Sequence, residues 1–451
     1  MSLSHLKSTR TCFLLCLFST ALVPVQATDV VIEYQTVADF ATNLFTDLAP
    51  LIALFGQDVS KQFLSQSIDW WDDILFSMAP VGILTIVLGA IRIAGDKTLR
   101  NIFGRAKEPP SVSEAEFLSS TSDDVSEVWN QRVVRKIDNG ESIKQILYDA
   151  TPGHQTVMNM WEAEFTRERH EYPYITHRDF HKNVHSLPED PETRRTWNTQ
   201  PPNLTLNAHA PIDNRYPVIA SAIFGVVLQL GVIAFQAVVY YRLRWAMTEN
   251  LVERYAFPLA SAGTCTLCLG VLICAHTIVH CTTKVVWLPA ERTKSEKKTL
   301  KVMWVQQSRS EEGFRSYVIF RNETETAPGN FRPIWGSYRI QDPRNVRLQN
   351  YSVLIGTVLC FVGFPLQFIG FRALHFSATL AQLVATIIMI VVRSLIRSGL
   401  SDYPQTVSLR TGYELDKVAL LISGLSSCRP GPHFLYWKEI DDGITPSQTP
   451  F

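Results

Sequence analysis

The sequence predicts an all-α integral membrane protein with about five transmembrane helices and small mixed α/β elements in its loops. Apolar residues make up 46% of the 451 residues, an ordinary share, but they concentrate in long blocks separated by polar stretches. A helix needs roughly 17–25 predominantly apolar residues to cross a bilayer. The blocks that satisfy or approach this length are 74–91, 217–239, 256–279, 352–371 and 376–392.

Basic residues near the ends of these blocks predict the orientation of the chain. They gather after the first, third and fifth blocks, and a basic excess marks the cytosolic side of a membrane. We therefore expect residues 92–216, 284–351 and 393–451 in the cytosol, and the acidic segment 28–73 on the luminal or extracellular side. The opposite orientation is favoured by three basic residues between the second and third blocks: Arg242, Arg244 and Arg254.

The N-terminal residues 1–27 have the layout of a secretory signal peptide. Lys7 and Arg10 precede an apolar core over 12–23, and a proline and small residues follow it. We expect cleavage after residue 27; the alternative is an uncleaved anchor. In the following segment, 28–73, apolar residues recur every three to four positions, which predicts amphipathic helices on the membrane surface or against the bundle.

Two of the predicted cytosolic regions contain patterns of small folded elements. "LKVMWVQQSRSEEGFRSYVIF", in 284–351, has two strand-like runs around a polar turn and predicts a β-hairpin. "GYELDKVALLISG", in the tail 393–451, predicts an amphipathic helix that ends at its glycine.

Histidine and cysteine residues suggest a metal site, and we weigh that hypothesis against a structural one. Cys265, Cys268 and Cys274 lie within an apolar block, where a small polarisable side chain suits helix packing. The histidines that a metal hypothesis would use are His177, His181, His185, His276 and His280. Di-metal membrane oxygenases also need adjacent histidine pairs, and this chain has none. We therefore expect no bound metal, and keep a histidine-dependent membrane oxygenase as an alternative.

Three N-x-[ST] sequons begin at Asn203, Asn322 and Asn350. All three fall in regions predicted to be cytosolic, where the glycosyl transferase does not act. We therefore expect them to be unmodified.

Composition and motifs limit the possible functions. Lys and Arg equal Asp and Glu at 42 each, so nothing indicates a nucleic-acid partner. The apolar blocks lack Asp, Glu, Lys and Arg, which disfavours proton-coupled transport. The sequence has no Walker loop, G-x-S-x-G or H-E-x-x-H motif. We expect a non-enzymatic membrane protein of the secretory pathway or plasma membrane, without a cofactor, whose partners are the lipid bilayer and proteins bound by its cytosolic loops. A metabolite export protein is a further alternative.

Several stretches resemble a filamentous-fungal family of uncharacterised multi-pass membrane proteins. They include "LAPLIALFGQDVSKQFLSQSIDWWDDILFSMAPVGILTIVLGAIRIAG", "GRAKEPPSVSEAEFLSSTSDDVSEVWN" and "LQFIGFRALHFSATLAQLVATIIMIVVRSLIRSGLSDYP". Such proteins are often labelled ankyrin-repeat proteins, but the ankyrin T-P-L-H pattern is absent here. The resemblance implies a multi-pass membrane protein, with an expected place beside secondary-metabolite genes, and it assigns no functional residues.

Overall fold

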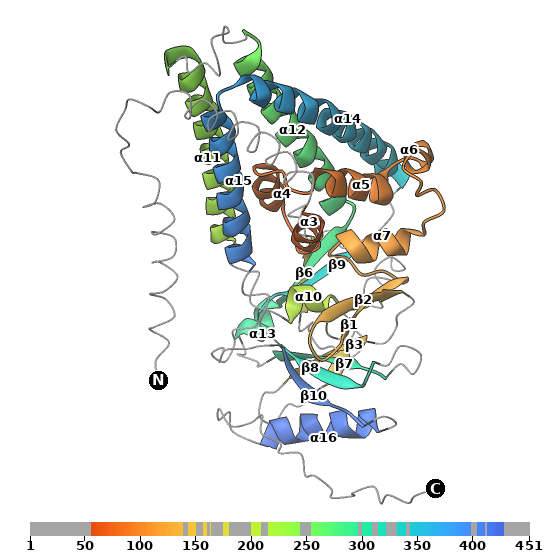
Figure 1. Cartoon of the computed structure of the whole chain (residues 1–451). Coiled ribbons are helices and arrows are strands. Elements are labelled where there is room, and N and C mark those ends of the chain that lie inside the picture. The colour runs from red at the N-terminus through yellow and green to blue at the C-terminus, as the bar shows by residue number, and fades with distance from the viewer. Residues whose placement is uncertain are drawn as a thin grey trace, which may run out of the picture.

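The computed structural model places a group of long helices at one end of the molecule and a β-rich part at the other (Figure 1). It describes the following residues: 56–138, 143–149, 157–159, 163, 175–179, 200–208, 215–243, 254–295, 300–308, 314–321, 332–339, 343–397, 404–410 and 413–427.

Among the described residues, four helices are long and apolar enough to cross a membrane. They are α11 (Tyr216–Val238), continued by the π-helical turn η2 (Val239–Leu243), α12 (Ala256–Val279), α14 (Pro343–Ala373) and α15 (Phe376–Ile396). These helices contain the second to fifth blocks of the sequence analysis. The predicted largely helical character, with several helices long and apolar enough to cross a membrane, is confirmed, while the number of such helices among the described residues is four and not five.

The first apolar block, 74–91, is not one helix, so the prediction of a fifth span is wrong. The structure divides it between α4 (Trp70–Ser77) and α5 (Ile83–Ala94). Pro80 lies in the break, where its missing N–H and its ring disfavour a continuous helix. Gly82, which precedes α5, has a φ of 71°, a left-handed conformation that glycine adopts without strain.

Both ends of the α4–α5 segment lie near the β-rich part. Asp72 forms an ion pair with Arg215, the residue before α11. Near the end of α5, the carbonyl oxygen of Ile93 accepts a hydrogen bond from Arg339, which follows strand β9 (Ile334–Tyr338) of the β-rich part. The start of α4 and the end of α5 therefore both lie toward the β-rich part.

Three sheets form the β-rich part. The five-stranded sheet has the order β10-β8-β7-β3-β4, and β5-β6-β9 and β1-β2 form the other two. The strands are β1 (Val125–Trp129), β2 (Val134–Asp138), β3 (Ile143–Asp149), β4 (Val157–Asn159), β5 (Ile175–Asp179), β6 (Thr283–Pro289), β7 (Leu300–Gln306), β8 (Tyr317–Phe320), β9 (Ile334–Tyr338) and β10 (Gln405–Ser408). The predicted hairpin corresponds to β7 and β8, which pair antiparallel.

The remaining described helices are short. They are α3 (Gln57–Leu64), α6 (Lys97–Ile102), α7 (Pro110–Phe117), α10 (Leu204–Asn207), α13 (Glu291–Ser295) and α16 (Glu414–Ser427). The last of these contains the amphipathic pattern of the tail, and its buried Val418 packs with residues of β7 and β8.

The five-stranded sheet joins segments that the long helices separate in the chain. β3 precedes α11, β7 lies between α12 and α14, and β10 follows α15; β3 pairs with β7, and β10 pairs with β8. These segments therefore lie on one side of any membrane that the four helices cross.

Residues just before α4 lie on that side too. The Lys284 ammonium group in β6 donates to the carbonyl oxygens of Ser67 and Ile68. This differs from the sequence analysis, which placed 28–73 across the membrane from the loops. The difference concerns the described residues just before α4, for any membrane that the four candidate helices cross.

α12 and α14 pack closely through glycines. Gly356, Gly363 and Gly370 recur at seven-residue spacing along α14, and each faces the backbone or side chains of α12. Gly263 and Gly270 of α12 face α14 in the same way. Small residues let two membrane helices approach until their backbones touch, which maximises dispersion contacts where water does not drive packing.

Candidate functional site

Charged side chains from five parts of the chain meet around α4, where the long helices join the β-rich part. The sequence starts this helix locally: Asp69 is its N-cap and accepts a hydrogen bond from the N–H of Trp70. Asp72, three residues later, accepts one from the N–H of Asp69 at 3.2 Å. This reciprocal capping box fixes the first turn of α4 and so positions Asp72 and Asp73.

Asp72 is fully buried and pairs with two arginines. Its Oδ2 lies 2.6 Å from Arg215 Nη2, and its Oδ1 lies 3.1 Å from Arg397 Nη2. Burial alone raises the pKa of Asp72, but the charges of Arg397 and Arg215 outweigh that effect, so the pKa lies below its usual value. This carboxylate therefore ties α4 to the start of α11 and the end of α15 through two ion pairs.

The neighbouring Asp73 has a different environment. Its side chain is 1% exposed, its Oδ2 lies 3.1 Å from His276 Nδ1, and its Oδ1 has no hydrogen-bond partner. Burial raises the pKa of Asp73, and the hydrogen bond from His276 offsets only part of that rise. Two adjacent carboxylates thus have opposite pKa shifts, because one has two arginine partners and the other has a histidine.

Lys284 is the buried cation nearest to this pair on the β side. Its ammonium group donates to Ile68 O at 2.6 Å and to Ser67 O at 3.2 Å. Burial lowers the pKa of Lys284 to about 8, although the charges of Asp73 and Asp72 oppose that shift. The hydrogen bonds of this lysine hold the chain before α4, so its contribution is positional.

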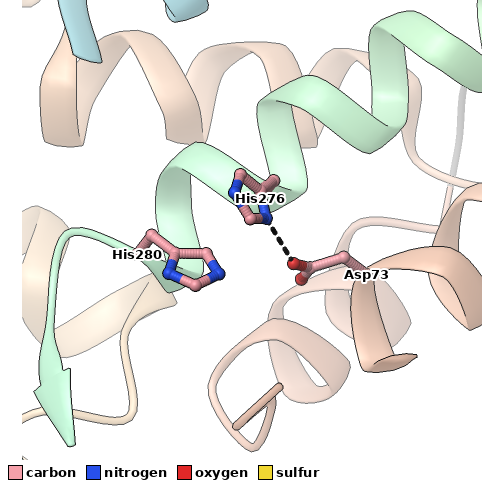
Figure 2. Close-up of side chains that lie close together, drawn as sticks. All are labelled: Asp73, His276 and His280. Atoms are coloured by element: carbon pink, nitrogen blue, oxygen red, sulfur yellow. Dashed lines mark hydrogen bonds and ion pairs between the residues drawn. The ribbon is translucent and has the colours of Figure 1, made fainter. Parts of the chain in front are cut away.

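Two histidines at the end of α12 face Asp73 (Figure 2). His276 lies in the last turn of the helix and His280 is its C-cap, so their four-residue spacing places them on one face. Their ring centroids are 3.9 Å apart. One ligand atom from each histidine and one from Asp73 all lie within 4.8 Å of one another. Two imidazoles and a carboxylate are a donor set that divalent transition metals accept.

Arg393 stabilises the broken end of α4. Its buried guanidinium donates to the carbonyl oxygens of Leu75, Phe76 and Ala79. It also lies 4.8 Å from the ring centroid of Phe76 and 5.7 Å from that of Phe63. The guanidinium therefore supplies donors to helix-end carbonyls that have no partner within the helix.

Further side chains satisfy the carbonyls of the break itself. The side-chain amide of Gln229 in α11 donates to the carbonyl of Met78, and the Ser60 hydroxyl donates to that of Val81 at 2.7 Å. These side chains, together with Arg393, supply donors to carbonyl oxygens of the irregular backbone between α4 and α5.

The structure brings together only part of the predicted histidine set. His276 and His280 belong to the cluster just described. His177 lies in strand β5, opposite Trp287 of β6, so the helical stripe predicted from its spacing does not form at His177. His181 and His185 lie outside the described residues.

The predicted structural cysteines Cys265, Cys268 and Cys274 lie in α12, and all three are free thiols. Cys274 is fully buried against the helix pair, whereas Cys265 is exposed. They lie outside the cluster around Asp73.

The three sequon asparagines have different environments. Asn203 is 1% exposed, its Nδ2 donates to Ser119 O at 2.9 Å, and its Oδ1 accepts from the N–H of Ser337 at 2.8 Å. Asn350 lies in the first turns of α14, inside a candidate membrane span. Asn322 lies outside the described residues.

No protein-family model, no curated protein and no solved structure matches this chain.

Proposed function

We propose that the chain is a non-enzymatic membrane protein that holds its β-rich part in the cytosol and presents it to a protein partner. The observation that carries the proposal is the shared five-stranded sheet, whose strands come from three segments separated by membrane helices. Because the β-rich part is connected to the long helices at several points, it cannot rotate about one flexible linker. The hydrogen bonds from Lys284 in β6 to the carbonyl oxygens of Ser67 and Ile68 fix it further to the chain before α4.

Asn203 supports the cytosolic placement of the β-rich part. Glycosylation attaches a sugar to the side-chain nitrogen of asparagine, and in this fold that nitrogen is buried and donates to Ser119 O. In the lumen, the sequon would meet the transferase before folding, and a modified Asn203 could not enter its buried position. The basic cluster from Lys284 to Lys301 favours the same side.

The cytosolic placement has a consequence for the N-terminus. The described residues before α4 share the side of the β-rich part. Residues 28–55 contain no apolar block long enough to cross a bilayer. A cleaved signal peptide would place them in the lumen, so this proposal takes the alternative in which residues 12–23 are retained as an anchor.

Cysteine accessibility tests the sidedness. In sealed microsomes with the cytosolic face outward, a membrane-impermeant maleimide should label Val133→Cys without detergent, because Val133 is 51% exposed in the β-rich part. Tyr255→Cys, 49% exposed at the opposite end of α12, should react only after detergent is added. The reverse pattern would place the β-rich part in the lumen and refute the proposed orientation.

The partner surface that we propose is the edge strand β4. It is the last strand of the five-stranded sheet, with Met158 buried and Val157 51% exposed. An extended peptide can add to the end of a sheet as a further strand, and the exposed side chain of Val157 on β4 offers it an apolar contact.

Proximity labelling tests this surface. A biotin ligase fused after Phe451 should enrich a defined set of cytosolic proteins, and Val157→Asp should lose members of that set because an exposed charge on β4 opposes docking. Val133→Asp is the matched control, because Val133 is equally exposed at 51% but lies on the β1–β2 hairpin. Equal enrichment with both variants would show that β4 is not the interaction surface.

A further inference from the structure

The cluster of Asp73, His276 and His280 goes beyond the interaction role proposed above. Asp73 comes from α4, and the two histidines come from the end of α12, so the fold brings together residues more than two hundred positions apart. Figure 2 shows the carboxylate directed at His276, with the ring of His280 beside it.

The cluster has both an available ligand atom and a route of access. Asp73 is 1% exposed, and its Oδ1 has no hydrogen-bond partner. The nearest buried ammonium group, that of Lys284, donates to backbone carbonyls and not to this carboxylate. The side chain of His276 is 52% exposed, so an ion can reach the cluster from outside.

The geometry requires only a modest contraction to hold an ion. Asp73 Oδ2 and His276 Nδ1 are already 3.1 Å apart, and the full set of ligand atoms lies within 4.8 Å. Metal–ligand bonds of about 2.0–2.2 Å in a tetrahedral site place neighbouring ligand atoms about 3.3–3.5 Å apart. Rotation of the histidine side chains at the end of α12 can provide the difference, since His276 is not packed on all sides.

We propose that Asp73, His276 and His280 bind one divalent first-row transition-metal ion and leave at least one coordination position open. Two imidazole nitrogens and one carboxylate oxygen suit Zn²⁺ or Fe²⁺, whereas Mg²⁺ and Ca²⁺ prefer oxygen ligands. The sequence analysis expected no metal because the chain lacks the adjacent histidine pairs of di-metal membrane oxygenases. It could not include Asp73, whose place beside α12 depends on the break between α4 and α5.

Metal content of the full-length protein in detergent tests the site. The protein is incubated with Zn²⁺ or, under anaerobic conditions, with Fe²⁺, freed of excess ion and analysed by mass spectrometry. We expect about one ion per chain for the wild type with at least one of the two metals. His276→Ala and Asp73→Asn should each lower the affinity for that metal at least about tenfold.

Three further variants make the result decisive. His276→Cys restores a ligand and should recover Zn²⁺ binding, which a merely structural role for His276 would not predict. His375→Ala replaces a histidine that lies before α15, outside the cluster, and this variant should bind the metal with wild-type affinity. His280→Ala should resemble His276→Ala, and the thermal stability of each metal-free variant shows whether it folds. Absence of stoichiometric metal in the wild type, or unchanged binding in His276→Ala, would overturn the proposal.

Discussion

Gly363→Leu is expected to separate α12 from α14 and to destabilise the helical part by about 3 kcal/mol or more, the upper range for overpacking. A Cβ atom at this position would lie 2.6 Å from the backbone nitrogen of Leu267 and 2.9 Å from its Cα. Those atoms belong to the backbone of a long helix and cannot rotate away as a side chain can. The two helices therefore have to move apart, and the neighbouring contacts of Gly356 and Gly370 are lost with them.

The free energy of unfolding is measured on the purified protein in mixed detergent. Unfolding is monitored through the loss of the helical circular dichroism signal. Gly231→Leu is the matched control: Gly231 also lies in a membrane helix, α11, but a Cβ there meets nothing within 4 Å. This variant should keep nearly the wild-type stability. If both variants lose the same stability, the loss results from replacing a glycine in any helix. Close packing of α12 on α14 would then not explain it.

Four of the five apolar blocks could be located from the sequence because hydropathy over about twenty residues is a local property. The block 74–91 has the same hydropathy signal but not the same structure. Pro80 indicated a kink, yet a proline alone does not distinguish a bent span from a segment that turns back. Whether the segment bends or turns back depends on Arg393 of α15 and Gln229 of α11. These residues lie far along the chain and donate hydrogen bonds to carbonyl groups at the break.

The candidate site could be predicted only in part for the same reason. The spacing of His276 and His280 placed them on one helix face, and this local inference agrees with their facing the same carboxylate. Asp72 and Asp73 belong in the sequence to the acidic segment 28–73, next to an apolar block. Their different roles come from partners that the chain supplies much later: Arg397 for Asp72, and His276 for Asp73.

Arg393→Met is expected to cost about 3 kcal/mol or more of stability and to loosen the α4–α5 segment. Methionine fills much of the same volume but donates no hydrogen bonds, so the carbonyls of Leu75, Phe76 and Ala79 lose the guanidinium donors in a buried place. Each buried carbonyl left without a partner costs about 1–3 kcal/mol. Burial of the guanidinium charge of Arg393 itself destabilises the folded protein, and the variant removes that cost. The net loss of stability is therefore smaller than the summed cost of the three unpaired carbonyls.

Arg372→Met is the matched control, because Arg372 lies near the end of the neighbouring helix α14 but is exposed. It should unfold as the wild type does. Hydrogen exchange adds a local readout: in Arg393→Met the amides of residues 74–82 should exchange faster than in the wild type, while those of β7 should be unchanged. Protected amides in 74–82 together with wild-type stability would mean that the break is held without Arg393. In that case Pro80 and Gly82 alone would determine the turn between α4 and α5, and the buried charge of Arg393 in α15 would need another explanation.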